Sequence, residues 1–208
     1  VRHKIDLLQN EGKTAIVICT RKEVEGIIGL QDRVRPESKQ VIEEIRKMGI
    51  TPIMLTGDHR TSALAVAQKI GIDDVKANLL PEDKAQAIKE LLVKYTTVAM
   101  VGDGINDAPA LALSNVGITM SELGSDTAIE AASIVILSDH LNRLPFLIRL
   151  GRKGIQTIRI NIVLAISIKL IFILLALTGK SNLALAIFAD VGITLIVILH
   201  SFRLSKIQ

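Results

Sequence analysis

The hydrophobic pattern divides the chain into an alternating part and an almost uniformly apolar part. Up to about residue 137, short β-branched or apolar runs alternate with stretches whose apolar residues recur every three or four positions. The runs predict buried strands and the periodic stretches predict amphipathic helices. Together they predict an α/β, Rossmann-like parallel sheet with helices on both faces. Strands are expected at residues 14–19, 24–30, 52–55, 75–77, 97–101, 116–119 and 134–137, and helices at 38–48, 63–70, 81–95, 108–114 and 126–132.

The last third of the chain has a different character. Residues 141–159 are basic and amphipathic, and residues 161–177 and 183–199 are almost wholly apolar. With their flanks, the two apolar segments can each reach the roughly 20 residues that cross a lipid bilayer, and the short polar turn between them makes them a hairpin. The excess of basic residues at both ends of this hairpin places residues 1–160 and the C-terminus in the cytoplasm of a multi-pass plasma or inner membrane protein. The alternative, two buried helices of a soluble protein, is disfavoured because almost no polar face remains for water.

Charge separates the same two parts. The net charge is +4, but residues 146–208 hold eight Lys or Arg against the single Asp190. The acidic remainder has no basic face, and one Tyr with no Trp leaves few stacking platforms, so no nucleic acid partner is expected. Cys19 is the only cysteine, which excludes a disulfide within this chain, and its β-like surroundings predict a buried thiol. A first residue Val1 rather than Met suggests a fragment.

The most informative pattern is Val-Gly-Asp-Gly-Ile-Asn-Asp-Ala-Pro-Ala-Leu at residues 101–111. It follows an apolar strand, so its polar turn is expected at the carboxyl end of a sheet, where α/β proteins bind phosphate and Mg²⁺. Asp103 and Asp107 bracket the turn and can both face one Mg²⁺ ion. Asn106 can donate to a phosphate oxygen or hold a carboxylate in place. Taken alone, the segment also fits a loop rich in helix caps.

Two further segments have matching chemistry. Thr56 and Gly57 end a predicted strand and offer a hydroxyl and an unhindered amide to the oxygens of a phosphoryl group, while Asp58 can cap the next helix. Lys84, near the start of a predicted helix, can neutralise a phosphate, although most helix lysines are simply solvated. The order Thr-Gly-Asp, Lys, Gly-Asp-Gly-x-Asn-Asp is therefore more specific than any of its parts.

In this order, residues 54–58, 83–84 and 100–111 resemble the phosphorylation domain of P-type cation-pumping ATPases, members of the haloacid dehalogenase superfamily. Asp-x-x-Arg-Pro at 32–36 and Gly-Ser-Asp-x-Ala at 124–128 are similar to other landmarks of the family. The resemblance implies a haloacid-dehalogenase-like sheet followed by a two-helix transmembrane hairpin, with ATP and Mg²⁺ as cofactors of the complete pump.

The resemblance also implies a role for each motif. Thr56 and Lys84 would hold the phosphoryl group. Asp103 and Asp107 would hold Mg²⁺, and Asp58 would make a hinge-side contact near the nucleotide. The family's nucleophile lies in an Asp-Lys-Thr-Gly-Thr segment that this chain lacks, so the chain alone is expected not to hydrolyse ATP, and a missing N-terminal part of the same pump is an expected partner.

Each apolar segment carries one charge near its middle. Lys169 lies about twelve residues before the centre of the hairpin turn and Asp190 about nine after it, which at 1.5 Å per residue gives depths about 4 Å apart. Charges this deep are costly, so the two either pair or surround a cation path; isolated snorkelling is the alternative. With Phe-Ala-Asp-Val-Gly at 188–192 they resemble the zinc, cadmium and lead exporters, which implies Zn²⁺ or Cd²⁺ as cargo, with Pb²⁺ or Co²⁺ as alternatives. His200 is expected to be an interfacial residue rather than a ligand.

The expected organisation has five segments. Residues 1–25 hold the end of the nucleotide-binding domain and a lead-in strand, 26–142 form the phosphorylation domain, 143–160 a basic cytoplasmic linker, 161–200 the transmembrane hairpin and 201–208 a cytoplasmic tail. The implied function is a part of an ATP-driven, Mg²⁺-dependent exporter that works through an aspartyl phosphate. Two alternatives stay open: a membrane-tethered phosphatase of the same superfamily, and a truncated, non-enzymatic module that binds metal or regulates a pump.

Overall fold

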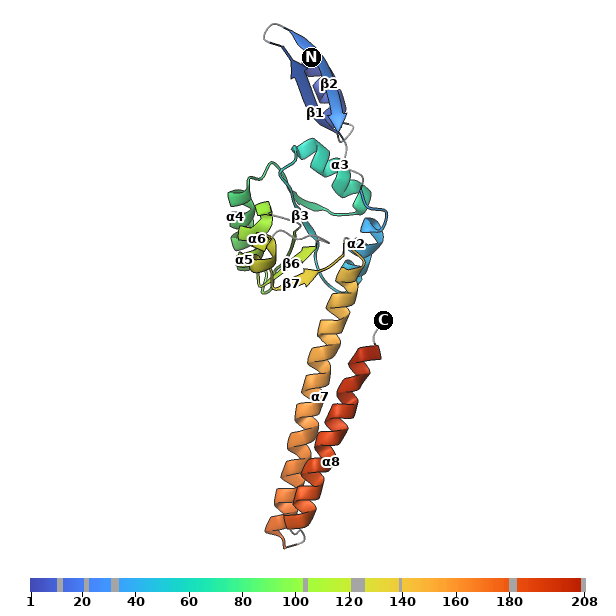
Figure 1. The fold of residues 1–208 in the computed structure, drawn as a ribbon, viewed down its shortest axis with the longest axis vertical. Coiled ribbons are helices and arrows are strands. Elements are labelled where there is room, and N and C mark those ends of the chain that lie inside the picture. Colours follow the sequence, from blue (N-terminus) through green and yellow to red (C-terminus); the bar gives the residue numbers. More distant parts are fainter. Residues whose placement is uncertain are drawn as a thin grey trace. The chain divides into compact units, whose positions relative to one another are not determined.

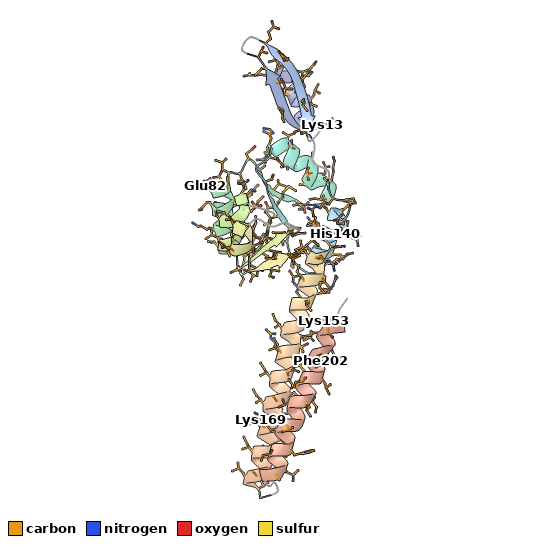
Figure 2. All side chains as sticks on the ribbon, viewed as in Figure 1. Lys13, Glu82, His140, Lys153, Lys169 and Phe202 are labelled. Carbon is orange, nitrogen blue, oxygen red and sulfur yellow. The ribbon has the colours of Figure 1, made fainter. Side chains whose placement is uncertain are left out.

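The computed structural model describes residues 1–10, 13–20, 23–30, 34–102, 105–120, 126–138, 140–179 and 183–206 (Figure 1). The chain divides into two compact units, Val1–Arg143 and Leu144–Gln208. The first unit combines strands with short helices, whereas the second is helical, and Figure 2 adds the side chains to both.

The first unit begins with helix α1 (Arg2–Asn10) and an antiparallel pair of strands, β1 (Thr14–Cys19) and β2 (Val24–Leu30). These strands confirm the two expected from the sequence. The expected burial of Cys19 is wrong, because its side chain is exposed. The physical reason is that β1 and β2 form a sheet of only two strands, on which apolar side chains such as Ile16 and Ile28 are also exposed.

The remaining described strands of the first unit pair in parallel. Strand β3 (Ile53–Leu55) pairs with β4 (Asp74–Lys76), and β5 (Ala99–Gly102), β6 (Val116–Met120) and β7 (Ile134–Ile136) follow one another in a second ladder. Each parallel neighbour is reached through a crossover that contains a helix, as parallel pairing requires. The predicted α/β class is confirmed.

Helices line both sides of these strands. In Figure 1, α4, α5 and α6 gather on one side of β3, β6 and β7, and α2 and α3 lie on the other. The helix spans are α2 (Ser38–Lys47), α3 (Arg60–Ile70), α4 (Pro81–Lys94), the 3₁₀ turn η1 (Ile105–Asp107), α5 (Ala108–Leu113) and α6 (Asp126–Ala131).

One buried cluster joins α4 and α5 to β5. Its most enclosed large side chains, Ile88 and Leu111, are about 1% exposed, and Ile53 and Leu55 of β3 pack against it. Helix α5 also lies directly on β6: a Cβ added at Gly117 would come 2.6 Å from the carbonyl oxygen of Leu111, a contact too short for any side chain. This packing holds the ends of β3 and β5 close to the first turns of α4 and α5.

The second unit is a helical hairpin, with α7 (Arg143–Leu177) and α8 (Leu183–Ser201) followed by the 3₁₀ turn η2 (Phe202–Lys206). Helix α7 runs without a break through the residues expected to form a linker and on through the first apolar segment. At 1.5 Å per residue its 35 residues are about 52 Å long. By length and composition, Arg143–Leu177 and Ile187–Ser205 can each cross a membrane, and most of their apolar side chains are exposed.

Candidate functional site

Thr56 lies at the end of β3 and organises the turn that follows it. Its half-buried hydroxyl accepts a hydrogen bond from the backbone N–H of Asp58 and donates one to the Asp58 carboxylate, both at 3.1 Å. The single hydroxyl proton is therefore directed at Asp58. To donate to a bound phosphoryl oxygen, this hydroxyl has to rotate away from the carboxylate.

The Thr56 turn is tied through the backbone to the segment that leads into α4. The N–H of Leu79 donates to the Thr56 carbonyl at 3.1 Å, and the N–H of Asn78, a residue in the left-handed region with φ of 56°, donates to the Asp58 carbonyl at 2.9 Å. A Cβ added at Gly57 would lie 3.2 Å from the Leu79 carbonyl oxygen, so a glycine suits this close approach. The turn at β3 and the start of α4 thus form one connected edge.

The residue that caps α3 differs from the expected one. His59, not Asp58, occupies the N-cap, with extended backbone angles (φ −60°, ψ 140°), and its Nδ1 accepts a hydrogen bond from the N–H of Thr61 at 3.4 Å. The Asp58 carboxylate is already bonded to the Thr56 hydroxyl, which turns it back toward β3. Asp58 consequently belongs to the turn of the candidate site and not to the helix cap.

Lys84 and Asp107 form the most enclosed ion pair among the described residues of this unit. Lys84 lies in the first turn of α4 and Asp107 closes η1 just before α5, and these elements pack together. The Lys84 Nζ lies 2.7 Å from Asp107 Oδ1, and the side chains are only 16% and 12% exposed. The structure therefore brings together two of the predicted site residues, 23 positions apart in sequence.

The Asp107 carboxylate rests against the end of β5. A Cβ added at Gly102 would lie 2.8 Å from both Cβ and Oδ2 of Asp107, closer than real side chains approach. Because Gly102 has no side chain, the Asp107 carboxylate can occupy the space beside it and contact Lys84. Gly-Asp-Gly at residues 102–104 therefore has a steric reason for its first glycine, a reason the sequence did not reveal.

The fit of this site to Mg²⁺ can be judged from Asp107 alone, because Asp103 lies outside the described residues. Asp107 offers a nearly buried carboxylate at a strand end, and one or two carboxylates completed by water and phosphate oxygens are the usual ligands of Mg²⁺. Within the described part of the chain, no group of three or more His, Cys, Asp or Glu residues could hold a metal ion by itself. Asn106, next to Asp107 in the sequence, is exposed. The residues present fit Mg²⁺ bound together with a phosphate, rather than in a cage made of protein alone.

In the second unit, the two predicted charges meet. Lys169 of α7 and Asp190 of α8 form an ion pair, with 3.2 Å between Nζ and Oδ1. Their side chains are 62% and 57% exposed when no lipid surrounds the hairpin. Pairing is one of the two arrangements that their similar depth predicts, and it satisfies both charges inside an apolar segment.

A polar cluster that the sequence did not single out also joins these helices. Asn161 of α7, only 9% exposed, donates from Nδ2 to the hydroxyl of Ser201 at 3.0 Å, and its Oδ1 lies 2.7 Å from Nδ1 of His200. His200 therefore has a specific partner on α7. The signal available in the sequence was one Asn at the start of an almost wholly apolar segment, but its partners lie 39 and 40 residues away.

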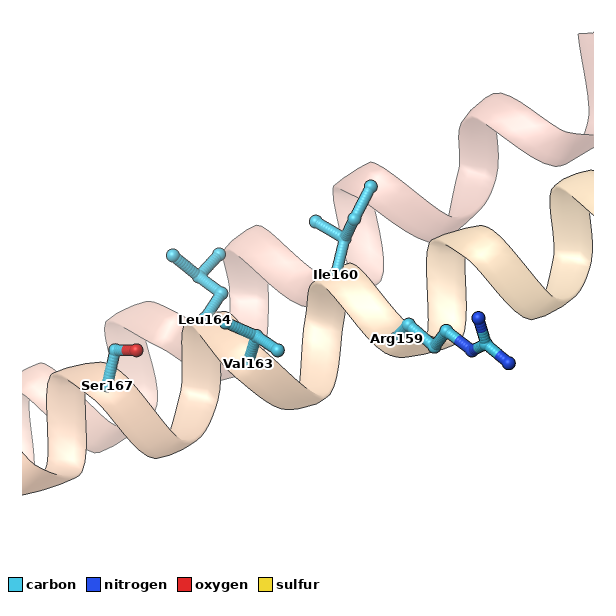
Figure 3. Close-up of a pocket in the computed structure, with 5 residues that line it drawn as sticks. All are labelled: Arg159, Ile160, Val163, Leu164 and Ser167. Atoms are coloured by element: carbon cyan, nitrogen blue, oxygen red, sulfur yellow. The ribbon is translucent and has the colours of Figure 1, made fainter.

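An open apolar groove of about 380 Å³ lies on α7 (Figure 3). It contains none of the predicted site residues, and its apolar lining is that expected where a membrane helix meets lipid or another helix. The residues that line it are Arg159, Ile160, Val163, Leu164 and Ser167.

Comparison with known proteins gives close relatives for almost the whole chain. A cadmium-transporting ATPase of Staphylococcus aureus is 46% identical over 207 residues, covering 99% of this chain and 28% of that protein. The zinc/cadmium/lead-transporting P-type ATPase of Escherichia coli (strain K12) is 40% identical over 202 residues, covering 97% and 27%. The crystal structure of a zinc-transporting PIB-type ATPase in the E2.Pi state matches with a TM-score of 0.85 at 39% identity, covering 98% of this chain and 33% of that one.

These similarities confirm the resemblance to heavy-metal P-type ATPases, and the chain spans between a quarter and a third of the length of these relatives. The P-type ATPases to which it is similar are membrane proteins, in agreement with its two helices that can cross a membrane. The family of haloacid dehalogenase-like hydrolases matches residues 1–115, which include the Thr56 turn and the Lys84–Asp107 pair. The chain therefore belongs to the haloacid dehalogenase-like hydrolase family.

Proposed function

We propose that this chain forms the phosphorylation domain and a transmembrane hairpin of an ATP-driven pump that exports Zn²⁺ or Cd²⁺ from the cytoplasm. Residues 1–160 and the C-terminus lie in the cytoplasm, and the hairpin lies in the plasma membrane. One observation carries the proposal: the buried Lys84–Asp107 pair at the strand ends, where a phosphate-neutralising cation and a carboxylate for Mg²⁺ stand side by side.

The cytoplasmic unit contributes the groups that hold the phosphoryl group. The Thr56 hydroxyl and the Gly57 N–H donate to its oxygens, and Lys84 neutralises its charge once the ammonium turns from Asp107 toward the ligand. Asn106, exposed next to Asp107, donates a further hydrogen bond. Asp58 orients the Thr56 hydroxyl and contacts the hinge side of the nucleotide.

Asp107, together with Asp103, holds the Mg²⁺ ion. When bound, Mg²⁺ neutralises charge on the transferring phosphoryl oxygens. The chain has no Asp-Lys-Thr-Gly-Thr segment, and the acceptor of the phosphoryl group is proposed to belong to the part of the relatives' length that this chain does not cover. The covalent step then needs both parts.

The hairpin contributes the charged pair on the ion path. Asp190 offers an oxygen ligand, which suits a borderline divalent ion better than soft Cu(I), and Lys169 balances its charge when no ion is bound. The names of the relatives support zinc or cadmium as cargo, with lead as a further candidate. Cobalt is the remaining alternative.

The proposal is tested with the full-length gene product in inverted membrane vesicles, by measuring Cd²⁺-stimulated ATP hydrolysis and Cd²⁺ uptake together. Asp107→Asn is expected to lower the hydrolysis rate by about a hundred-fold or more, as for the loss of a main electrostatic contact in an active site. Asp190→Asn is expected to abolish stimulation by the metal. Asp73→Asn is the matched control, because Asp73 makes an ion pair with Arg46 at the surface and should keep full activity.

Two results would contradict the pump. Hydrolysis of a simple phosphate ester that needs neither ATP nor Cd²⁺ would identify a membrane-tethered phosphatase. Binding of Cd²⁺ without hydrolysis or uptake, in the full-length protein, would identify a metal-binding or regulatory module.

A further inference from the structure

The cluster of Asn161, His200 and Ser201 is a second polar connection between α7 and α8, separate from the Lys169–Asp190 pair. Asn161 is nine-tenths buried and uses both ends of its amide on α8: Nδ2 donates to Ser201 Oγ at 3.0 Å, and Oδ1 lies 2.7 Å from His200 Nδ1. Ser201 in turn donates to the carbonyl of Val197 at 2.9 Å. The contacts bridge two helices that are otherwise apolar over most of their length.

The hydrogen bonds determine where the protons lie. The Ser201 hydroxyl donates its proton to the carbonyl of Val197, so it accepts the hydrogen bond from Nδ2 of Asn161. The other end of the Asn161 amide, Oδ1, then faces the imidazole and can only accept. His200 Nδ1 therefore carries a proton and donates it. Both contacts join Asn161 to α8, so moving α8 by one residue along α7 would break both of them at once.

The cluster and the ion pair lie at two different heights of the same hairpin. Asn161 is eight residues from Lys169 on α7, about 12 Å along the axis, and His200 is ten residues from Asp190 on α8, about 15 Å. A single contact between two helices leaves them free to pivot and slide. Two contacts at separate heights restrict both the sliding and the rotation of one helix against the other.

We propose that Asn161, with His200 and Ser201, is a clasp that sets the register of α7 against α8 and so presents Asp190 opposite Lys169 for the transported cation. Asn161 is thereby a positioning residue: it acts on the ion path through the helix pair. This inference rests on the proposed pump function for its consequence in transport, but the clasp itself can be tested without it.

The first test measures the register in this chain, reconstituted in lipid vesicles, with Cys19→Ser to remove the native thiol. Cysteines at Lys169 and Asp190 report the native register, and cysteines at Lys169 and Thr194 report a shift of one helical turn. Both cysteine pairs replace Lys169 and so remove the ion pair, and the cross-linking ratio then reports on the clasp. Asn161→Leu, a change of nearly equal shape, is expected to lower the ratio of native to shifted cross-linking by a bifunctional maleimide about eight-fold, the factor for two average side-chain hydrogen bonds between membrane helices.

The matched control for Asn161→Leu is Thr178→Val. The Thr178 hydroxyl donates to carbonyls of its own helix, at 3.2 Å to Leu174 and 3.0 Å to Leu175, so its loss should leave the ratio unchanged. Ser201→Ala should reproduce part of the effect, and Ser201→Thr, which keeps the hydroxyl, should not. An unchanged ratio in Asn161→Leu would overturn the clasp.

The second test uses the full-length protein and separates positioning from general loss of structure. Asn161→Leu is expected to raise the Zn²⁺ concentration for half-maximal ATPase activity about eight-fold, while kcat stays within about two-fold. In a Lys169→Ala background, Asn161→Leu should raise this Zn²⁺ concentration by less than about half as much on a logarithmic scale. An equal factor in both backgrounds would overturn the positioning role. Absence of Zn²⁺-stimulated ATPase in the unmodified protein would refute the proposed pump, while cross-linking would still decide whether the clasp exists.

Discussion

Gly102 provides a sharp test of how the candidate site is built. A Cβ at this position would lie 2.8 Å from both Cβ and Oδ2 of Asp107, whereas carbon atoms in contact are separated by about 3.5 to 4.0 Å. In Gly102→Ala, Asp107 therefore has to move by roughly 1 Å, which disturbs the 2.7 Å contact between its carboxylate and Lys84. We expect the first unit to lose about 2 to 3 kcal/mol of stability, within the usual cost of overpacking a core.

Gly26→Ala is the matched control. Gly26 is also a strand glycine, but a Cβ there meets no atom of the described residues within 4 Å. Because glycine inside a strand is less favourable than alanine by roughly 0.5 to 1 kcal/mol, this substitution should be neutral or slightly stabilising. The two changes add the same methyl group to the same type of element, so their difference isolates the contact with Asp107.

Urea unfolding followed by the fluorescence of Tyr95 measures this difference in the whole chain. Tyr95 is the single tyrosine of a chain without tryptophan, and it packs against the buried cluster of α4, α5 and β5, so the signal comes from the first unit. With a slope near 2 kcal/mol per molar urea, the midpoint should fall by about 1 to 1.5 M for Gly102→Ala.

Two outcomes would refute the steric argument. The first is a midpoint for Gly102→Ala equal to that of Gly26→Ala. The second comes from a double-mutant cycle with Asp107→Gly, which removes the atoms that the new Cβ would strike, at a position whose side chain makes no cap hydrogen bond. In that background Gly102→Ala should cost less than half as much, and an undiminished cost would show that Asp107 is not the obstacle.

Three further changes test other contacts of the same unit. Lys84→Met leaves the Asp107 carboxylate, which is 12% exposed, without its partner, and should lower the free energy of unfolding by about 3 kcal/mol in the same urea titration. Adding Asp107→Asn should restore at least half of this loss, and purely additive losses would contradict the ion pair. Thr56→Val removes both 3.1 Å bonds to Asp58 at about 1 kcal/mol each, so hydrogen exchange at the Asp58 amide should accelerate roughly thirty-fold, while Thr56→Ser should preserve the native rate. Thr119→Val replaces by a methyl group a fully buried hydroxyl that has no hydrogen-bond partner among the described residues, and it should raise stability by about 1 kcal/mol; a loss of stability would show that this hydroxyl does have a partner.

The strands and helices of the α/β unit could be predicted because local periodicity reports directly on burial. Residues 97–101, for example, are apolar at every position that the sheet and helices cover, and β5 is found there. Periodicity does not report how many strands a sheet contains, and this is why the burial expected for Cys19 on the two-stranded β1–β2 sheet is wrong. Nor does it report that α7 continues through the basic stretch, where Pro145 is accommodated in the first turn of the helix.

The contacts within the candidate site depended on partners far apart in sequence. Residue types predict roles for Lys84 and Asp107, but the direct pairing of the two follows from the packing of α4 on α5. Asp58 was expected at a helix cap, and the competing hydroxyl of Thr56 keeps it in the turn instead. The hydrogen bonds of Asn161 depend on the register of α7 against α8, and no local sequence pattern reports this register.

Both functional places of the proposed pump hold a Lys–Asp pair, and the same physical argument accounts for each. An unpartnered carboxylate or ammonium is costly in a protein interior or in lipid, so a site designed for a charged ligand needs a counter-charge when the ligand is absent. Lys84 supplies it to Asp107 at 2.7 Å, and Lys169 supplies it to Asp190 at 3.2 Å. Because the counter-charge is a flexible side chain rather than a second fixed dipole, it can withdraw when a cation arrives, and the released ammonium can then turn to another anion. In the proposed pump the anion at Asp107 is the phosphoryl group, so the binding of a cation and the binding of phosphate are proposed to favour each other at this site.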